Sequence, residues 1–393
     1  MSRIVLVTAR WGASHGESGA IARLLAGAVS QRCEVGVVSL CTPGPSRVPG
    51  PATKTRRDGV FLVHEIAAAA AMPVRAGLAR AALSLGGEDR LPEVAGARLV
   101  ELMGGRASGV VELIASLRPD SVLLVGPETW WLPEALGLSV SGARLASVPL
   151  IGDDALADLV QLSPLYGGVD AVGVVSEAER RRVTRRPETV IGPARSRPTE
   201  LMELDVAFAV NRPAANQLMV GMAQFDRFVV LLTGFPDGSP GAVRSPGHDY
   251  VGAGLGPVAV AEVAHGHWSV SDKTQLREVP VRPSRPNLWK LLAHAELCLD
   301  LRPQGILGRE TLESLLLGTP VVVPEGTVAH EHAERSNGGL WYSDYREMFD
   351  AGKAILDSPL LRATLSTQGS EWATMRHGDQ ERFAAQVARL SLG

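Results

Sequence analysis

The sequence predicts an α/β protein built from two doubly wound, Rossmann-like domains. Continuous apolar runs at residues 4–8 and 35–40 are typical of parallel strands that are buried on both faces. An amphipathic helical pattern at residues 18–31 lies between them, and this strand–helix–strand order is a βαβ unit. A second series of the same kind follows in the back half of the chain, so the sequence indicates two units of roughly equal size.

The domain boundaries are predicted from changes in composition. Residues 192–204 contain two prolines and are interpreted as a linker. We therefore expect an N-terminal domain at residues 1–195 and a C-terminal domain at residues 196–370, which begins with an apolar strand at residues 206–210. Residues 371–393 carry an amphipathic helical pattern and are expected to form a separate terminal helix.

Composition and charge exclude several classes of function. The chain has 393 residues, 45 % of them hydrophobic, and a net charge of -3, which gives no reason to expect nucleic acid as a partner. Its three cysteines lack CxxC spacing, so neither a disulfide framework nor a zinc site is expected, and a reducing, cytoplasmic location fits. His265 and His267 are interpreted as non-metal, because no clustered partners accompany them. No apolar window is long enough for a transmembrane segment.

The most specific stretch of the sequence is residues 287–324. Gly308 precedes a helix predicted at residues 310–317, and a buried strand is predicted at residues 320–324. The N-terminus of a helix presents unpaired backbone N–H groups and the positive end of the helix dipole, which suit a diphosphate. Glu313, one turn inside the helix, is expected to point its carboxylate toward the same place. A solvated surface carboxylate is the alternative for Glu313.

This stretch resembles the C-terminal signature of glycosyltransferase family 4. The resemblance implies the GT-B architecture, in which two Rossmann-like domains face each other across a cleft and a last helix crosses back to the N-terminal domain. It also implies that Glu313 accepts hydrogen bonds from the ribose hydroxyls of a sugar nucleotide. The residues in register with the signature are Ala295, Glu296, Gly308, Leu312, Glu313, Gly318, Pro320, Val321 and Val322.

One acid of the family signature is missing. The family pairs two glutamates with seven residues between them, and Gly305 occupies the first of these positions. Glycine can do no acid–base or charge-stabilising work. Glu310 is the nearest acid, although its place one turn before Glu313 makes it no obvious substitute; Glu310 and Glu128 are taken as the catalytic candidates. Thr311, together with the two glycines, completes the expected donor-binding set on this helix.

A second family feature is only half present. In the family, the first strand of the C-terminal half ends in Gly-Arg and is followed by Lys-Gly, and these cations hold the phosphates of the donor. Here the strand predicted at residues 206–210 is followed by Arg212, whose guanidinium suits bidentate phosphate contact. Asn216 or Gln217 stands at the approximate place of the lysine. The resemblance therefore implies a weakened cationic hold on the diphosphate.

The loop after the first strand, residues 9–17, is expected at the cleft because of the strand order. It does not read GxGxxG, and no GxxxxGK[ST] occurs in the chain, which argues against a dinucleotide fingerprint and a P-loop. His15 and Glu17 are candidates for acceptor contact and Gly16 for donor contact, with a plain turn and helix cap as the alternative. Trp130 is a further acceptor-side candidate, and packing is its alternative.

The sequence supports two main hypotheses of function. The first is a retaining, hexosyltransferase-type glycosyltransferase that binds a nucleotide sugar in the C-terminal domain and an unidentified acceptor in the N-terminal domain, without a metal or other cofactor. The second is a glycosyltransferase-like binding or scaffolding partner of an active glycosyltransferase, which the missing acid at Gly305 and the missing lysine favour. A nucleotide-sugar epimerase on the same architecture is the third reading.

Overall fold

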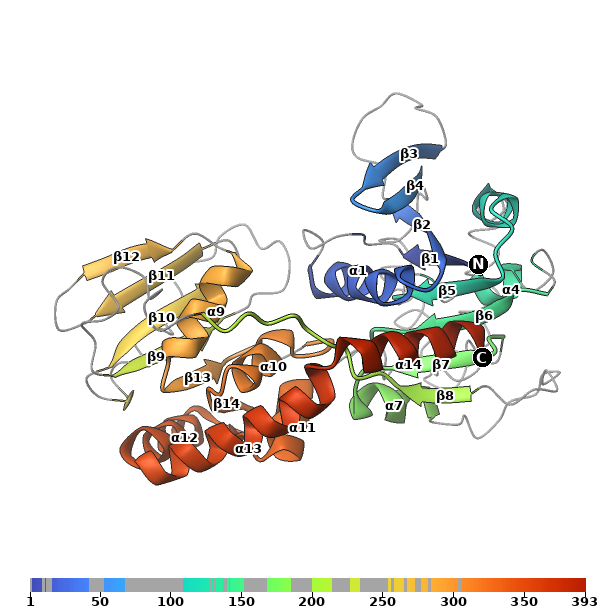
Figure 1. Cartoon of the computed structure of the whole chain (residues 1–393). Helices are drawn as coiled ribbons and strands as arrows, with labels where there is room; N and C mark the ends of the chain where they lie inside the picture. Colours follow the sequence, from blue (N-terminus) through green and yellow to red (C-terminus); the bar gives the residue numbers. More distant parts are fainter. Residues whose placement is uncertain are drawn as a thin grey trace, which may run out of the picture. The chain divides into compact units, whose positions relative to one another are not determined.

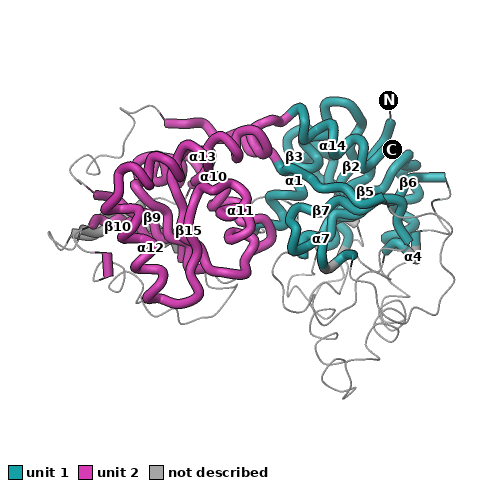
Figure 2. Tube along the Cα trace, turned by 90° about the horizontal axis from the view of Figure 1, so that it is seen from below, with its two compact units in different colours: residues 1–206, 381–393 teal, residues 207–380 magenta. Residues whose placement is uncertain are grey.

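The computed structural model consists of two compact units (Figure 2). Unit 1 contains Met1–Val206 and Glu381–Gly393, and unit 2 contains Ala207–Gln380. These boundaries lie later in the chain than the predicted boundaries at residues 195/196 and 370/371. The structure describes residues 2–8, 11, 16–41, 53–67, 109–126, 129, 132–136, 140, 142–151, 168–184, 200–213, 227–233, 254–255, 258–264, 267–272, 277–281, 284–302 and 305–393.

Unit 1 is built on an eight-stranded sheet with the order β3-β4-β2-β1-β5-β6-β7-β8. The central strand β1 pairs in parallel with β2 and β5, and five of its six residues are buried, as a continuous apolar run predicts. The bounds are β1 Arg3–Thr8, α1 Gly16–Ser30, β2 Glu34–Cys41, β3 Thr53–Asp58, β4 Phe61–Ala67, β5 Ser121–Val125, α4 Leu132–Leu136, β6 Arg144–Val148, β7 Ala171–Val174, α7 Glu177–Thr184, β8 Glu200–Glu203 and α14 Gln380–Leu392.

The terminal helix α14 packs on unit 1. Arg144 donates from Nε to the carbonyl oxygen of Leu390 at 3.1 Å, and Arg382 forms an ion pair with Asp205 at 2.8 Å. The helix brings Phe383 into a buried position. Contacts from two distant parts of the sequence therefore hold the last residues of the chain on the first unit.

Unit 2 has a seven-stranded sheet with the order β12-β11-β10-β9-β13-β14-β15, and β11 and β12 are antiparallel additions at one edge. The chain runs from β9 to β10 in one direction and from β13 to β14 in the other, so the direction reverses between β9 and β13 (Figure 1). The bounds are β9 Phe228–Leu232, β10 Ala259–Ala264, β11 His267–Asp272, β12 Arg277–Val281, α9 Arg285–His294, β13 Leu297–Asp300, α10 Arg309–Leu316, β14 Val321–Pro324, α11 Val328–Ser336, β15 Gly339–Tyr342, α12 Tyr345–Asp357 and α13 Pro359–His377.

The prediction of a strand at residues 206–210 is wrong. This segment pairs with no strand of the described residues, and the boundary between the two units falls within it. Its first three side chains, Val206, Ala207 and Phe208, are buried all the same: Phe208 is 3 % exposed, and its backbone N–H donates to the carbonyl oxygen of His377 at 2.9 Å. The first strand of the second sheet is β9. No helix among the described residues has both the length and the apolar character needed to cross a bilayer.

Candidate functional site

A glycine turn precedes α10, as the sequence predicts. Gly308 is the N-cap residue and has a φ of 62° and a ψ of 44°, the left-handed region that favours glycine. A Cβ atom added to Gly305 would lie 3.6 Å from the backbone nitrogen of Gly308, so the two glycines are neighbours in space. The turn therefore lies between the end of β13 and the N-terminus of α10, at the carboxyl edge of the parallel strands.

His332 of α11 holds this turn from the protein interior. Its Nε2 atom lies 2.7 Å from the carbonyl oxygen of Leu307, and since a carbonyl only accepts, Nε2 carries the proton. The imidazole is 3 % exposed and packs against the rings of Trp372 and His377. Burial lowers the pKa of His332 to about 4. The imidazole is therefore neutral at physiological pH and acts as a hydrogen-bond donor to the turn.

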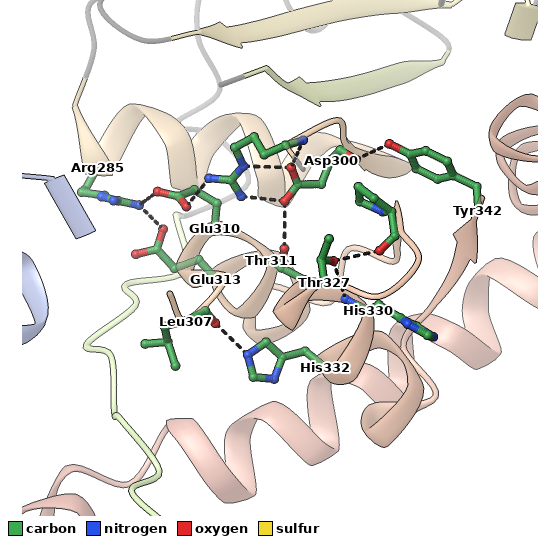
Figure 3. Close-up of polar contacts among 12 residues, drawn as sticks. Arg285, Asp300, Leu307, Glu310, Thr311, Glu313, Thr327, His330, His332 and Tyr342 are labelled. Carbon is green, nitrogen blue, oxygen red and sulfur yellow. Dashed lines mark hydrogen bonds and ion pairs between the residues drawn. The ribbon is translucent and has the colours of Figure 1, made fainter. Parts of the chain in front are cut away.

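Three arginines and three carboxylates meet beside the turn, and we call this group the arginine–carboxylate cluster. Figure 3 labels four of its members, Arg285, Asp300, Glu310 and Glu313. They come from the N-terminus of α9, the end of β13 and the first turns of α10. The carboxyl ends of β9 and β13, where the strand order reverses, are the place where open α/β sheets bind ligands. The members of the cluster are Arg285, Asp300, Arg302, Arg309, Glu310 and Glu313.

Asp300 and Arg302 form a bidentate pair within the cluster. Arg302 donates from Nε and Nη2 to the two carboxylate oxygens of Asp300 at 2.8 and 2.6 Å, which is a bidentate ion pair. The hydroxyl of Thr311 donates to the same carboxylate at 3.2 Å, and the hydroxyl of Tyr342 donates to the backbone carbonyl of Asp300 at 2.9 Å. Thr311 is 0 % exposed, so it supports Asp300 and offers no surface for the donor contact that was predicted for it.

Glu310 is held as an anion. Arg302 donates to its Oε2 at 2.7 Å, and Arg285 approaches its Oε1 at 2.8 Å. Burial alone would raise the pKa of Glu310, but the charges of the two arginines and its hydrogen bonds hold that pKa well below the usual range. A carboxyl group that stays ionised across the physiological range is a poor proton donor. The structure therefore argues against proton transfer by Glu310, and its role is to orient the arginines.

Glu313 is completely buried, with 0 % of its side chain exposed. Its Oε2 accepts from Nη1 of Arg285 at 2.8 Å, and its Oε1 accepts from Nε of Arg309 at 2.8 Å. Both oxygens thus have a cationic partner, which differs from the expected carboxylate open to a ribose. The i,i+4 spacing of Arg309 and Glu313 was visible in the sequence. Arg285 is 28 residues from Glu313, and no local pattern pointed to it.

Arg212 is displaced from the place that the sequence predicts. Its Nη2 lies 3.9 Å from where a Cβ of Gly318 would be, and Gly318 follows the C-terminal end of α10. The glycine turn is at the other end of this helix, about 12 Å away at 1.5 Å per residue. Residues 206–210 form no strand, so Arg212 does not follow the carboxyl end of one, and its phosphate contact stays a prediction.

The remaining predicted residues belong to the front half of the chain or lie outside the described residues. Gly16 and Glu17 form the start of α1, which follows β1 at the point where the first sheet also reverses direction, between β1 and β5. Nothing contradicts their predicted roles, which stay predictions. The predicted residues and positions outside the described part are His15, Glu128, Trp130, Asn216, Gln217 and His265.

The fold is that of two-domain GT-B glycosyltransferases. No family model and no curated protein sequence matches the chain. Solved structures do match: an α,α-trehalose-phosphate synthase (UDP-forming) from Burkholderia vietnamiensis has a TM-score of 0.68 at 16 % identity, covering 99 % of this chain and 98 % of that one. A sucrose-phosphate synthase from Thermosynechococcus elongatus has a TM-score of 0.64 at 15 % identity, covering 99 % and 98 %.

A third similar structure, an α,α-trehalose 6-phosphate synthase from Burkholderia multivorans, has a TM-score of 0.64 at 16 % identity, covering 99 % of this chain and 96 % of that one. The likeness extends over the whole chain in each case. At 15–16 % sequence identity these likenesses establish the fold alone. The activity has to be argued from the residues of the site. They support the GT-B architecture that the sequence predicts, and the narrower resemblance to family 4 stays a prediction.

Proposed function

We propose that the protein is a glycosyltransferase that binds a nucleotide-sugar donor at the arginine–carboxylate cluster of unit 2 and transfers the hexosyl group to an acceptor. The observation that carries the proposal is the position of this cluster. Partly buried, oriented arginines lie next to a glycine turn at the carboxyl edge of the sheet, where its strand order reverses. The likeness to a UDP-forming synthase adds the class of donor.

The chemistry follows from the charges of the cluster. Breaking the bond between sugar and diphosphate leaves negative charge on the leaving diphosphate, and fixed positive groups stabilise that charge in the transition state. Arg285 and Arg309 are held in place by Glu313, so they need little reorganisation when the charge develops. Glu313 thus acts through the arginines, and His332 fixes the glycine turn beside them. The acceptor contacts of His15, Glu17 and Trp130 and the cytoplasmic location stay predictions.

A thermal-shift panel tests the donor. The purified protein is heated with UDP, GDP, ADP and their glucose conjugates, and with the bare nucleosides as matched controls. A ligand at 100 times its Kd stabilises the folded state by about 2.7 kcal/mol. For a unit the size of unit 2 this raises the melting temperature by about 5–10 °C. A panel in which no nucleotide shifts the melting temperature more than its nucleoside would refute the proposal.

One observation favours the second candidate, a glycosyltransferase-like protein that binds donor without transferring it. Gly305 supplies no carboxylate, and the cluster carboxylates Glu310 and Glu313 are both ion-paired with arginines. No acid of the cluster is thus open to act next to a donor sugar. Incubating the protein with the donor that the panel identifies separates the two functions. Release of nucleoside diphosphate, with or without added sugar acceptors, supports catalysis, whereas tight binding without release supports the second candidate.

A further inference from the structure

Two arginines of the cluster differ in how they use the same edge of the guanidinium group. The Nε and Nη2 atoms of Arg302, which form one edge (the fork) of the guanidinium, donate to Asp300 at 2.8 and 2.6 Å. Its Nη1 donates to Glu310. Arg285 uses only Nη1, which lies 2.8 Å from both Glu310 and Glu313. Within the described part of the chain, no hydrogen bond involves Nε or Nη2 of Arg285.

The guanidinium of Arg285 is fixed at its Nη1 end, and its side chain is partly exposed. Arg285 is the first residue of α9, whose N-cap Ser284 accepts a hydrogen bond from the backbone N–H of Asn287. Two carboxylates bind the Nη1 end of the guanidinium, and the side chain as a whole is 36 % exposed. A planar guanidinium with a free Nε/Nη2 edge matches two oxygens of one phosphate in a bidentate geometry. The structure thus presents a preoriented donor pair that has no acceptor among the described residues.

We infer that Arg285 is the residue that binds the diphosphate of the donor, through the Nε/Nη2 fork and two non-bridging phosphate oxygens. This inference rests on the proposed function and assigns to Arg285 the role that the sequence predicts for Arg212 and the missing lysine. The cluster carries equal numbers of positive and negative side chains, so general attraction of anions is weak. Binding depends on the geometry of the fork, and a lysine, which has no fork, is a poor substitute.

Isothermal titration of three proteins tests the inference: wild type, Arg285→Lys, and Arg346→Lys as a control for an exposed arginine on α12. The probes are the nucleoside diphosphates UDP, GDP and ADP, their nucleosides, and inorganic pyrophosphate. We expect Arg285→Lys to weaken the binding of the diphosphate and of pyrophosphate at least tenfold, with nucleoside binding unchanged and Arg346→Lys like wild type. Lysine keeps the charge next to both carboxylates, and an unchanged melting temperature confirms that the variant folds.

The outcomes separate the inference from the proposed function. Equal affinity of wild type and Arg285→Lys for a nucleoside diphosphate overturns the role of Arg285 and leaves the glycosyltransferase proposal intact. If pyrophosphate binding depends on Arg285 but nucleoside diphosphates bind no more tightly than pyrophosphate, the role of Arg285 in phosphate binding is supported. The proposal that the donor is a nucleotide sugar is then overturned. Absence of binding for every probe overturns both. If Arg285→Lys melts early, Arg285→Gln in the presence of added guanidinium ions replaces it, and failure of guanidinium to restore pyrophosphate binding counts against the fork.

Discussion

Acidification should destabilise unit 2 through His332. The imidazole is 3 % exposed, its Nε2–H is bound to Leu307, and its Nδ1 has no hydrogen-bond partner among the described residues. Burial lowers its pKa, the hydrogen bond to Leu307 acts in the opposite direction, and the charges of Arg335 and Arg376 lower the pKa further. Protonation of Nδ1 would create a buried cation beneath the glycine turn.

The size and sign of the effect follow from the two pKa values. The pKa falls from 6.5 in the unfolded chain to about 4 in the folded protein. Between these values the unfolded chain binds a proton that the folded protein does not bind, so the free energy of unfolding decreases as the pH falls. At 1.36 kcal/mol for each pH unit, the total loss below pH 4 is about 3 kcal/mol. Above pH 6.5 the group contributes no dependence on pH.

The assay compares wild type with His332→Gln in urea denaturation at several pH values between 4.5 and 7.5. Glutamine keeps an N–H donor for the Leu307 carbonyl and does not titrate. We expect the wild-type free energy of unfolding to fall more steeply than that of the variant, by about 1.4 kcal/mol for each pH unit below 6. Parallel curves for the two proteins, or an NMR signal of His332 that titrates near pH 6.5, would show that the reasoning is wrong.

Three further predictions concern unit 2. Glu313→Gln should lower the free energy of unfolding in urea by about 3–5 kcal/mol, because two arginines lose a buried anionic partner; a loss below 1 kcal/mol would contradict this. Gly369→Ala should lower the stability by about 1–3 kcal/mol in thermal melts, since its Cβ would lie 2.9 Å from the Cα of Gly338, whereas Gly27→Ala has open space and should not. Cys298 is fully buried and burial raises the pKa of its thiol, so iodoacetamide should label it only in denaturant, as read by mass spectrometry.

The strands that the sequence predicts well are those whose apolar run is both continuous and buried in a parallel sheet. The run at residues 4–8 became β1, and the run at residues 121–125 became β5 with every residue buried. The edge strand β3, which reads TKTRRD, was missed because it has no apolar alternation and forms through backbone pairing with β4. The apolar run at residues 206–210 led to a wrong prediction of a strand, because a connecting segment can bury apolar side chains without joining a sheet.

The candidate site was predictable only where the signal is local. Gly308 was identified because it precedes a predicted helix and is in register with the family signature, and the structure places it as the N-cap of α10 in the left-handed conformation. The sequence also identified Glu313 as a residue of this helix near the turn, but it did not predict the ion pairs that Glu313 forms with Arg285 and Arg309. Arg285 comes from a different helix, and Asp300 from the end of β13, so their meeting depends on how the sheet orders its strands. No pattern in one stretch of sequence carries that information.

The burial of Glu313 also decides which groups of the cluster can face a donor. Glu313 is completely buried and binds an arginine at each oxygen, so a ribose hydroxyl could reach its carboxylate only if Arg285 or Arg309 moved away. Breaking a buried ion pair in this way costs about 3–5 kcal/mol, whereas a hydrogen bond to a charged group contributes about 1.5–3 kcal/mol. The exchange is unfavourable as long as the released arginine finds no new anionic partner. A diphosphate changes the balance, because it is itself an anion that an arginine can bind. Ligand contact at this cluster should therefore pass through the arginines, with the carboxylates behind them.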